Sequence, residues 1–221
     1  MSIIRIGYLS LVFGFAIFPR DAAAAPDGPE NQAELVEELE KTYEGVTSVK
    51  ADFEQVQRSV MGEVRQKGQV TIKRPMMARW EFLAPSASVM VTNGSTVWVY
   101  TPATKQVIET TNIGKGDGVM QLLDDLGKLE ELFDVTRFEE PGEGEGRRYL
   151  IELVPKNANN YKRIVVEFTR KDLKLYRVVV VDAMDGEIEL TFSHVKYNEP
   201  MADSEFDFQA PEDAQIIKGG L

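Results

Sequence analysis

The chain of 221 residues contains no cysteine and a single histidine, His194. A chain without cysteine forms no disulfide, has no catalytic thiol and cannot bind a metal through thiolates. One histidine is also too few for the usual zinc-dependent catalytic centres. His194 lies in the predicted strand "TFSHVKYN", where we expect a structural or solvent-facing role. We therefore expect no metal site and no cofactor.

The chain also lacks the sequence motifs of common enzymes. It contains no nucleophile elbow, no P-loop and no dinucleotide-binding fingerprint. The glycine-rich stretch 114–118 does not have phosphate-loop spacing and is more typical of a flexible hinge. The carboxylates of Asp182, Asp185 and Glu187 are better explained by a hairpin turn at Asp185-Gly186 than by a calcium site. These absences predict a protein that is not an enzyme.

Basic residues are scarce, since 25 Lys and Arg stand against 36 Asp and Glu, for a formal net charge of -11. Nucleic-acid binding requires clustered Lys and Arg to neutralise phosphates, so we expect no nucleic-acid partner. The same charge disfavours electrostatic docking on anionic lipid. The absence of cysteine also excludes an acylated N-terminal anchor on this chain.

One long uncharged apolar run is present, Ile6 to Phe18, which follows Arg5. The run is too short for a comfortable transmembrane helix and precedes an alanine-rich segment. We therefore predict a cleavable secretory signal peptide at residues 1–24 and a single domain at residues 25–221. The mature protein would be soluble and outside the cytoplasm, and an uncleaved membrane anchor is the alternative.

Two segments have the periodicity of amphipathic helices, residues 32–43 and 119–133. Asn31 is a suitable N-cap for the first, and Gly127 can break the second into two pieces. The apolar faces of the two helices include Leu35, Leu39, Leu122, Leu123 and Leu126.

Most of the remaining chain has the alternation of short antiparallel strands, with a strong hairpin signal at Asn93-Gly94. Some strands are apolar on both faces, as at Val178–Val181, which predicts a sheet covered on both sides. Only two or three helices are available to cover it. We predict a mainly β fold of the α+β class. It would be an incomplete antiparallel β-barrel, or half-barrel, closed by a lid of short α-helices over an apolar cavity.

The stretch "KRPMMARWEF", residues 73–82, places a charge among apolar side chains. Its even-numbered positions are apolar, yet Arg74 shares their parity. Aromatic, methionine and aliphatic side chains at even positions of neighbouring strands would form one apolar wall, lining either a cavity or an ordinary core. These residues are Val70, Ile72, Ala78, Trp80, Phe82, Met90, Trp98 and Tyr100.

A series of short motifs runs in order through residues 32–110. It consists of Phe53-x-Gln55, Arg74-Pro75, Trp80-Glu81-Phe82, Asn93-Gly94, Val97-Trp98-Val99-Tyr100, Pro102 and Gln106-Val107. The series resembles the periplasmic outer-membrane lipoprotein carriers of the LolA type. The order of elements in the rest of the chain, including the closing "FDFQAP" segment, agrees with this family.

The resemblance implies a monomeric periplasmic carrier whose apolar cavity shields the acyl chains of a lipoprotein. Such a carrier takes its cargo from an inner-membrane lipoprotein-releasing ABC transporter and gives it to an outer-membrane acceptor. The expected lining of the cavity is Phe53 together with the helix and wall residues named above.

Arg74 acquires a specific role from the resemblance. A guanidinium offers five donors, and the last carbonyls of a helix are free acceptors. In the family, the matching arginine bonds to the lid and holds it closed, which implies a latch with partners in 32–43 and 119–133. The alternative is that Pro75 shifts the strand register and the side chain reaches solvent.

Other hypotheses are consistent with the same features. One is a periplasmic lipid-binding or glycolipid-binding protein of the same fold. Another is the anchored acceptor of that fold, against which the missing cysteine counts. A third is an adaptor domain with a filled core that binds no ligand.

Overall fold

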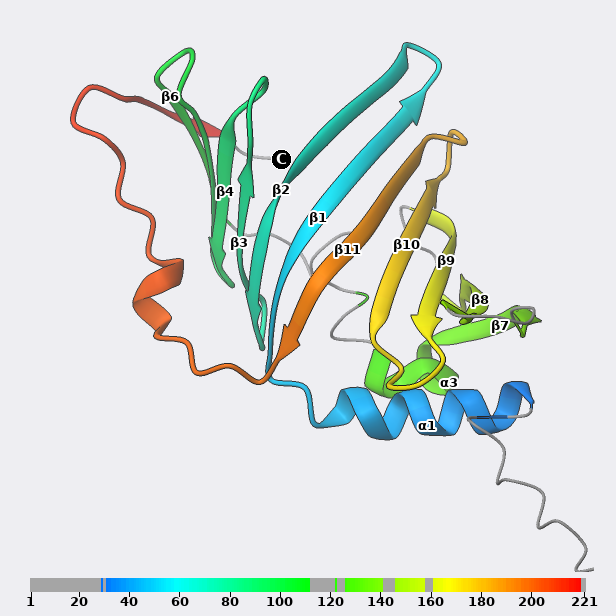
Figure 1. The fold of residues 1–221 in the computed structure, drawn as a ribbon. Helices are drawn as coiled ribbons and strands as arrows, with labels where there is room; N and C mark the ends of the chain where they lie inside the picture. Colours follow the sequence, from blue (N-terminus) through cyan, green and yellow to red (C-terminus); the bar gives the residue numbers. More distant parts are fainter. Residues whose placement is uncertain are drawn as a thin grey trace, which may run out of the picture.

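The computed structural model describes Pro29, residues 31–111, Leu122, and residues 126–140, 146–157 and 161–219. The predicted signal peptide, residues 1–24, lies outside this part of the chain. Within it, no helix is both long and apolar enough to cross a membrane. Most of the described residues belong to one strongly curved sheet (Figure 1).

The sheet contains twelve strands in the described residues. In chain order they are β1 (Ser48–Ser59), β2 (Gly62–Lys73), β3 (Met77–Phe82), β4 (Ser88–Asn93), β5 (Thr96–Thr101), β6 (Gln106–Thr111), β7 (Phe133–Glu139), β8 (Arg148–Pro155), β9 (Tyr161–Thr169), β10 (Leu175–Asp182), β11 (Glu187–Tyr197) and β12 (Gln215–Gly219). Their order across the sheet is β12-β6-β5-β4-β3-β2-β1-β11-β10-β9-β8-β7. The helical elements are α1 (Gln32–Glu44), the 3-10 turn η1 (Leu126–Lys128), α3 (Leu129–Leu132) and the 3-10 turn η2 (Asp203–Phe206).

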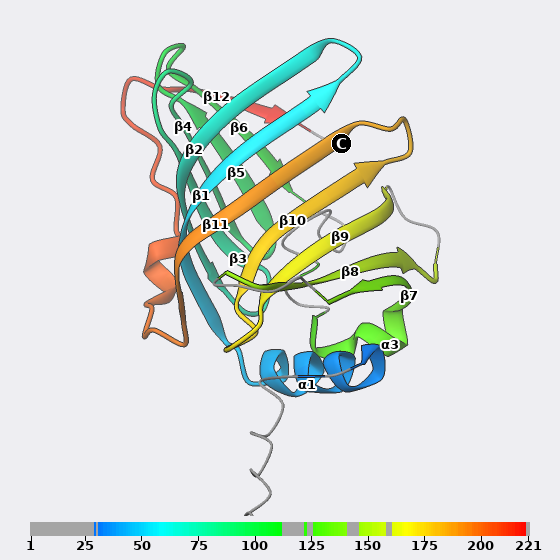
Figure 2. The ribbon, with the colours of Figure 1, turned by 45° about the vertical axis from the view of Figure 1, so that its right-hand side comes forward.

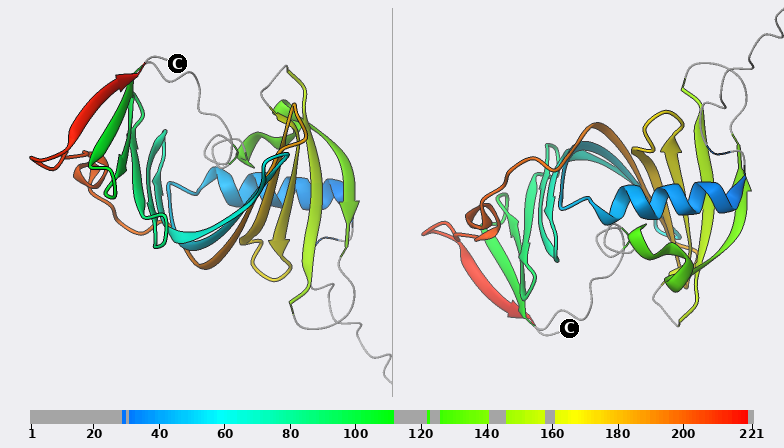
Figure 3. Two further views of the ribbon diagram at one scale, coloured as in Figure 1. Left: turned by 90° about the horizontal axis from the view of Figure 1, so that it is seen from above. Right: turned by 90° about the horizontal axis from the view of Figure 1, so that it is seen from below.

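The sheet is open, because β7 and β12 end the strand order and do not pair with each other (Figure 2). Seen along its strands, it curves around a concave side that holds α1 (Figure 3). The predicted half-barrel with helices is confirmed, with one correction. Strand β12 joins β6 in parallel, whereas the other neighbouring strands are antiparallel.

Helix α1 forms where the sequence predicts it. The side chain of Asn31 caps its first turn, with Oδ1 accepting a hydrogen bond from the Glu34 backbone N–H at 3.1 Å. Its apolar face, which includes Leu35 and Leu39, is fully buried in the core. The helix lies below the ends of β9 and β10 (Figure 1), so it covers one end of the concave face.

The second predicted helix, 119–133, is corrected by the structure. Phe133 already belongs to strand β7, and Gly127 lies in the 3-10 turn η1, which directly precedes α3. A Cβ atom added to Gly127 would lie 3.3 Å from the backbone of Glu44. The missing side chain of Gly127 therefore lets η1 pack closely against the end of α1.

The C-terminal segment covers the convex face of β3–β6, and Figure 1 shows it in orange and red outside these strands. Phe206 in η2 is fully buried, and the ring of Phe208 stacks on Trp98 at 6.2 Å between centroids. Lys73 Nζ holds η2 through Asp203 Oδ1 at 2.5 Å. This cover explains how β5 is apolar on both faces without a helix on its convex side.

A network of charged side chains joins β1, β9, β10 and β11 on the convex face. Arg177 contacts Glu189 at 2.8 Å and Glu167 at 2.7 Å, and Arg58 contacts Glu189 at 2.7 Å. Two hydrogen bonds lower the pKa of the Glu189 carboxyl below its ordinary value. The one from Arg177 has the larger effect and the one from Arg58 the smaller. The Glu189 side chain is only 18% exposed, so water screens these contacts incompletely.

Glu189→Gln is expected to lower the free energy of unfolding at pH 7 by roughly 1–2 kcal/mol, since it removes a half-buried carboxylate from two arginines. A carboxyl whose folded-state pKa is depressed stabilises the fold above its unfolded pKa of about 4.3. That contribution is lost as the pH falls from there through the lower folded-state pKa. Urea unfolding at pH 7 and at pH 3 checks this. The difference in free energy of unfolding between Glu189→Gln and wild type should be smaller at pH 3 than at pH 7. Glu54→Gln, in an exposed pair with Lys67, is the control and should change little at either pH.

Candidate functional site

The concave face of the sheet is the candidate functional site. Most of the predicted wall and helix residues form one apolar cluster there. Buried in it are Leu35, Leu39, Phe53, Val70, Ile72, Ala78, Trp80, Leu122 and Leu126, and partly buried against it are Phe82 and Met90. Leu123 lies outside the described residues. The cluster contains side chains from the helices and from β1–β4. At one end of the concave face, the helices and the sheet therefore share one apolar core.

Trp98 and Tyr100 are the exception, because they lie on the convex face. Residues that are paired across neighbouring strands share a face, and Met90 pairs with Val99, whereas Trp98 pairs with Val91. Both aromatic rings instead pack against the ring of Phe208 in the C-terminal segment, with 6.2 Å between ring centroids in each case. The expectation that they share a wall with Trp80 is therefore wrong. The two-residue connection between β4 and β5 pairs even positions with odd ones.

The same register places three further apolar residues on the concave face, none of which the sequence pattern indicates as part of the wall. Val99 pairs with Ile108, and Ile108 pairs with Ile217 of β12. Ile108 is 47% exposed and Ile217 is 40% exposed, so neither is covered by the described helices. These three residues, which we call the apolar strip, continue the wall from Met90 to the edge of the sheet. Contiguous apolar surface left open to solvent can serve as a binding site for apolar ligands.

Gly68 lies beneath the aromatic rings of the apolar wall and leaves room for them to pack closely on β2. It is paired with Phe53 on one side and with Phe82 on the other, and these two rings pack edge to face at 5.3 Å. A Cβ atom at Gly68 would lie 2.8 Å from the Phe53 ring and 2.1 Å from the Glu81 carbonyl oxygen. The absence of a side chain therefore allows Phe53 to lie flat over β2. A glycine in the interior of a strand is the sequence signal for such a close approach.

Arg74 is half-buried and lies directly after β2, where it reaches the end of α1. One guanidinium nitrogen, Nη1, donates to the carbonyl of Tyr43 at 2.6 Å and to the carbonyl of Val46 at 2.8 Å. The Arg74 backbone N–H also donates to the Thr47 carbonyl at 2.9 Å. The contact with Tyr43 lies in the predicted segment 32–43. The other predicted segment, 119–133, is only partly described.

The Tyr43 side chain fixes the same end of α1 from inside the core. Its hydroxyl donates to the Leu173 carbonyl at 3.0 Å and lies 2.9 Å from the Tyr197 hydroxyl. Burial, and then the neighbouring Tyr197, raise the pKa of Tyr43 well above its usual value, so the phenol stays neutral. The C-terminal end of α1 is therefore held from two sides, by Tyr43 in the core and by Arg74 at the rim.

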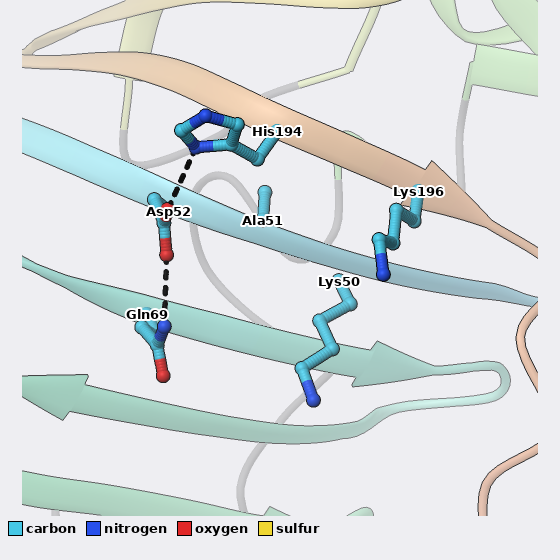
Figure 4. Close-up of a pocket in the computed structure, with 6 residues that line it drawn as sticks. All are labelled: Lys50, Ala51, Asp52, Gln69, His194 and Lys196. Atoms are coloured by element: carbon cyan, nitrogen blue, oxygen red, sulfur yellow. Dashed lines mark hydrogen bonds and ion pairs between the residues drawn. The ribbon is translucent and has the colours of Figure 1, made fainter.

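A shallow polar pocket of about 180 Å³ lies on the convex face (Figure 4). His194 Nδ1 is 2.8 Å from Asp52 Oδ2, and Gln69 donates to Asp52 Oδ1 at 2.9 Å. These hydrogen bonds, from Gln69 first and His194 second, lower the pKa of Asp52. His194 is exposed, one of the two roles expected from the sequence, and Lys50, Ala51 and Lys196 complete the lining. Its charged lining makes this pocket unsuitable for an acyl chain.

Among the described ranges, no group of three or more His, Cys, Asp or Glu side chains is arranged to hold a metal ion. The concave face itself offers apolar contact, through the cluster described above.

Comparisons with known proteins agree with this geometry. Residues 44–209 match the family described as "Outer membrane lipoprotein carrier protein LolA". A curated outer-membrane lipoprotein carrier protein from Idiomarina loihiensis is 30% identical over 193 residues, covering 86% of this chain and 88% of its own. One from Azotobacter vinelandii is 26% identical over 225 residues, covering 99% of this chain and 100% of its own.

The fold has a counterpart in a solved structure. An uncharacterized conserved protein from Thermus thermophilus superposes with a TM-score of 0.53 at 15% identity, covering 86% of this chain and 100% of its own. This likeness concerns the fold alone. On the sequence match over residues 44–209 and the curated relatives, the chain belongs to the LolA family of outer-membrane lipoprotein carrier proteins.

Proposed function

We propose that this protein is a periplasmic carrier that shields the acyl chains of lipoproteins and moves lipoproteins from the inner to the outer membrane. The observation that carries the proposal is the apolar concave face, which is filled under α1 and exposed along the apolar strip. Membership in the carrier family supports it. The concave side chains bind hydrocarbon, and the helices close over them when no cargo is present.

The energetics require that the cargo be only partly buried. Each buried CH₂ contributes about 0.8 kcal/mol, so roughly forty of them in two or three acyl chains would approach 30 kcal/mol. Non-covalent affinities do not exceed roughly 20 kcal/mol, and a carrier must also release its cargo. An apolar wall that is only partly covered, and for which α1 competes with the cargo, limits the affinity and allows release. The exposure of Ile108 and Ile217 is consistent with loose contact of this kind.

The protein would follow one route and meet two membrane partners. Residues 1–24 act as a signal peptide, residues 25–221 form the mature domain, and the domain acts as a monomer in the periplasm. An inner-membrane lipoprotein-releasing ABC transporter supplies the cargo, and an outer-membrane acceptor receives it. Arg74 acts as the latch that stabilises the closed state, because its bonds to the Tyr43 and Val46 carbonyls require α1 to be in place.

Mass spectrometry of ligands that co-purify with the protein from its native host tests the function. The proposal expects N-terminally acylated polypeptides, in amounts that fall when the apolar strip is changed by Ile108→Asp, which places a charge on the binding wall. Ile216→Asp is a matched control, because Ile216 pairs with Val107 on the opposite face and is 50% exposed. Co-purified glycolipid without acylated polypeptide would overturn the proposal, as would a folded protein that carries no ligand and binds no hydrophobic fluorescent probe.

A further inference from the structure

Trp80 has a buried hydrogen-bond donor that is not used within the described part of the chain. Its side chain is 4% exposed, and its indole Nε1 has no acceptor there. Buried polar groups are almost always paired in native proteins, because an unpaired group loses its hydration without compensation. Phenylalanine at this position would keep apolar contacts without that cost. The indole N–H therefore calls for a specific explanation.

The surroundings of Trp80 consist of apolar side chains. Its ring packs edge to face on Phe53 at 4.9 Å and stacks with Phe82 at 6.4 Å. Across the strands it is paired with Val70 and Met90. Phe82 and Met90 are only partly buried, so this part of the wall lies where the covered cluster meets the exposed part of the concave face. An acceptor that enters here would meet the indole N–H in a dry environment, where a hydrogen bond is strengthened.

The other tryptophan of the chain shows the usual arrangement. Trp98, on the convex face, donates from its Nε1 to Glu109 Oε2 at 3.2 Å. Of the two indole N–H groups, the one outside the binding wall is paired within the protein. The one inside the wall is left for a group that the described chain does not supply.

We propose that Trp80 Nε1 donates a hydrogen bond to the carbonyl oxygen of the ester or amide that joins an acyl chain to its cargo. The inference rests on the proposed carrier function and names a recognition element within that site. A carbonyl is the best match, because it is a neutral acceptor attached directly to a hydrocarbon chain. A bare hydrocarbon would leave the donor unpaired, and a phosphate or carboxylate would be costly to bring into this apolar cluster. This hydrogen bond would fix the position of the carbonyl, and therefore how far the bound acyl chain extends along the apolar wall.

A pair of lipids that differ in one carbonyl tests the inference. The probes are 1-palmitoyl-glycerol, an ester, and 1-O-hexadecyl-glycerol, the ether with the same headgroup and chain. Wild type is expected to bind the ester about five- to tenfold more tightly, the effect of one hydrogen bond in a buried site. Trp80→Phe should bind both lipids with similar affinity, close to that of wild type for the ether. Trp98→Phe is the matched control and should keep the preference.

A spectroscopic measurement on the unmodified protein makes the test independent of whether Trp80→Phe folds. The two indole N–H resonances are followed by NMR during titration with each lipid. The Trp80 resonance should shift downfield with the ester and much less with the ether, while the Trp98 resonance stays in place. Equal affinity of wild type for both lipids, or a preference that persists in Trp80→Phe, would overturn the inference but leave the carrier function intact. Failure of wild type to bind either lipid would count against both.

Discussion

Arg74→Leu is expected to give a protein that loads cargo and then retains it. The wild-type guanidinium donates to the carbonyl of Tyr43, in the last turn of α1, at 2.6 Å and to that of Val46, just after the helix, at 2.8 Å. A hydrogen bond to a charged group contributes about 1.5–3 kcal/mol, so losing the pair should disfavour the closed state by roughly 3 kcal/mol. That corresponds to a population shift of about a hundredfold towards the open state. Cargo binds the open state, so its apparent affinity rises and its release slows.

Transfer between two membrane populations measures this effect. The protein is loaded at donor vesicles that contain the transporter and a labelled lipoprotein, and arrival of the label at acceptor vesicles is followed over time. Arg74→Leu should accumulate as the loaded complex, with transfer reduced at least tenfold, and Arg74→Lys should be intermediate because an ammonium group lacks the planar fork. Arg79→Leu is the matched control, since Arg79 lies on the convex face and pairs with Glu81 at 2.7 Å. Transfer by Arg74→Leu at the wild-type rate would contradict the role of Arg74 as a latch.

Gly68→Ala is expected to destabilise the fold by about 3 kcal/mol or more, a large effect for one methyl group. The added Cβ would lie 2.1 Å from the Glu81 carbonyl oxygen, which belongs to the backbone of β3 and cannot rotate away. It would also lie 2.8 Å from the Phe53 ring. Strands β2 and β3 would have to separate, and Phe53 would have to leave its place over β2. Because Phe53 and Trp80 pack together, the binding wall should be disturbed along with the fold.

Urea unfolding of Gly68→Ala, followed by circular dichroism, measures this cost directly. Gly45→Ala is the control, because a Cβ there meets nothing within 4 Å and the backbone φ of -83° suits alanine. That variant should be within about 0.5 kcal/mol of wild type, or slightly more stable. If Gly68→Ala unfolded at the same urea concentration as Gly45→Ala, the close contact between β2, β3 and Phe53 would not exist as described.

Features set by local sequence were predictable. The cap at Asn31, the apolar face of α1 and the hairpin at Asn93-Gly94 each depend on a few neighbouring residues. The need for Gly127 depends instead on a distant contact. That glycine is needed where η1 crosses Glu44, a contact between segments about eighty residues apart.

The placement of Trp98 and Tyr100 shows where reasoning from parity fails. A two-residue connection pairs position i with position i+3, so an even residue on one strand faces an odd residue on the next. The turn between β4 and β5 therefore moves Trp98 and Tyr100 to the face opposite Trp80. The sequence contains this information, because Asn93-Gly94 predicts the turn. What it could not supply was the cover of these rings by Phe208, more than a hundred residues away.

A release experiment tests whether this protein carries lipoproteins by their acyl chains. Inner-membrane vesicles from the native host, holding a labelled lipoprotein, are incubated with ATP and the purified mature protein. The membranes are then removed, and the supernatant is analysed by gel filtration. The acylated lipoprotein is expected to leave the membrane and co-elute with the carrier, whereas the same lipoprotein without its acyl chains should not form this complex. An acylated lipoprotein that stays in the vesicles, or a complex that forms equally well without acyl chains, would contradict this role.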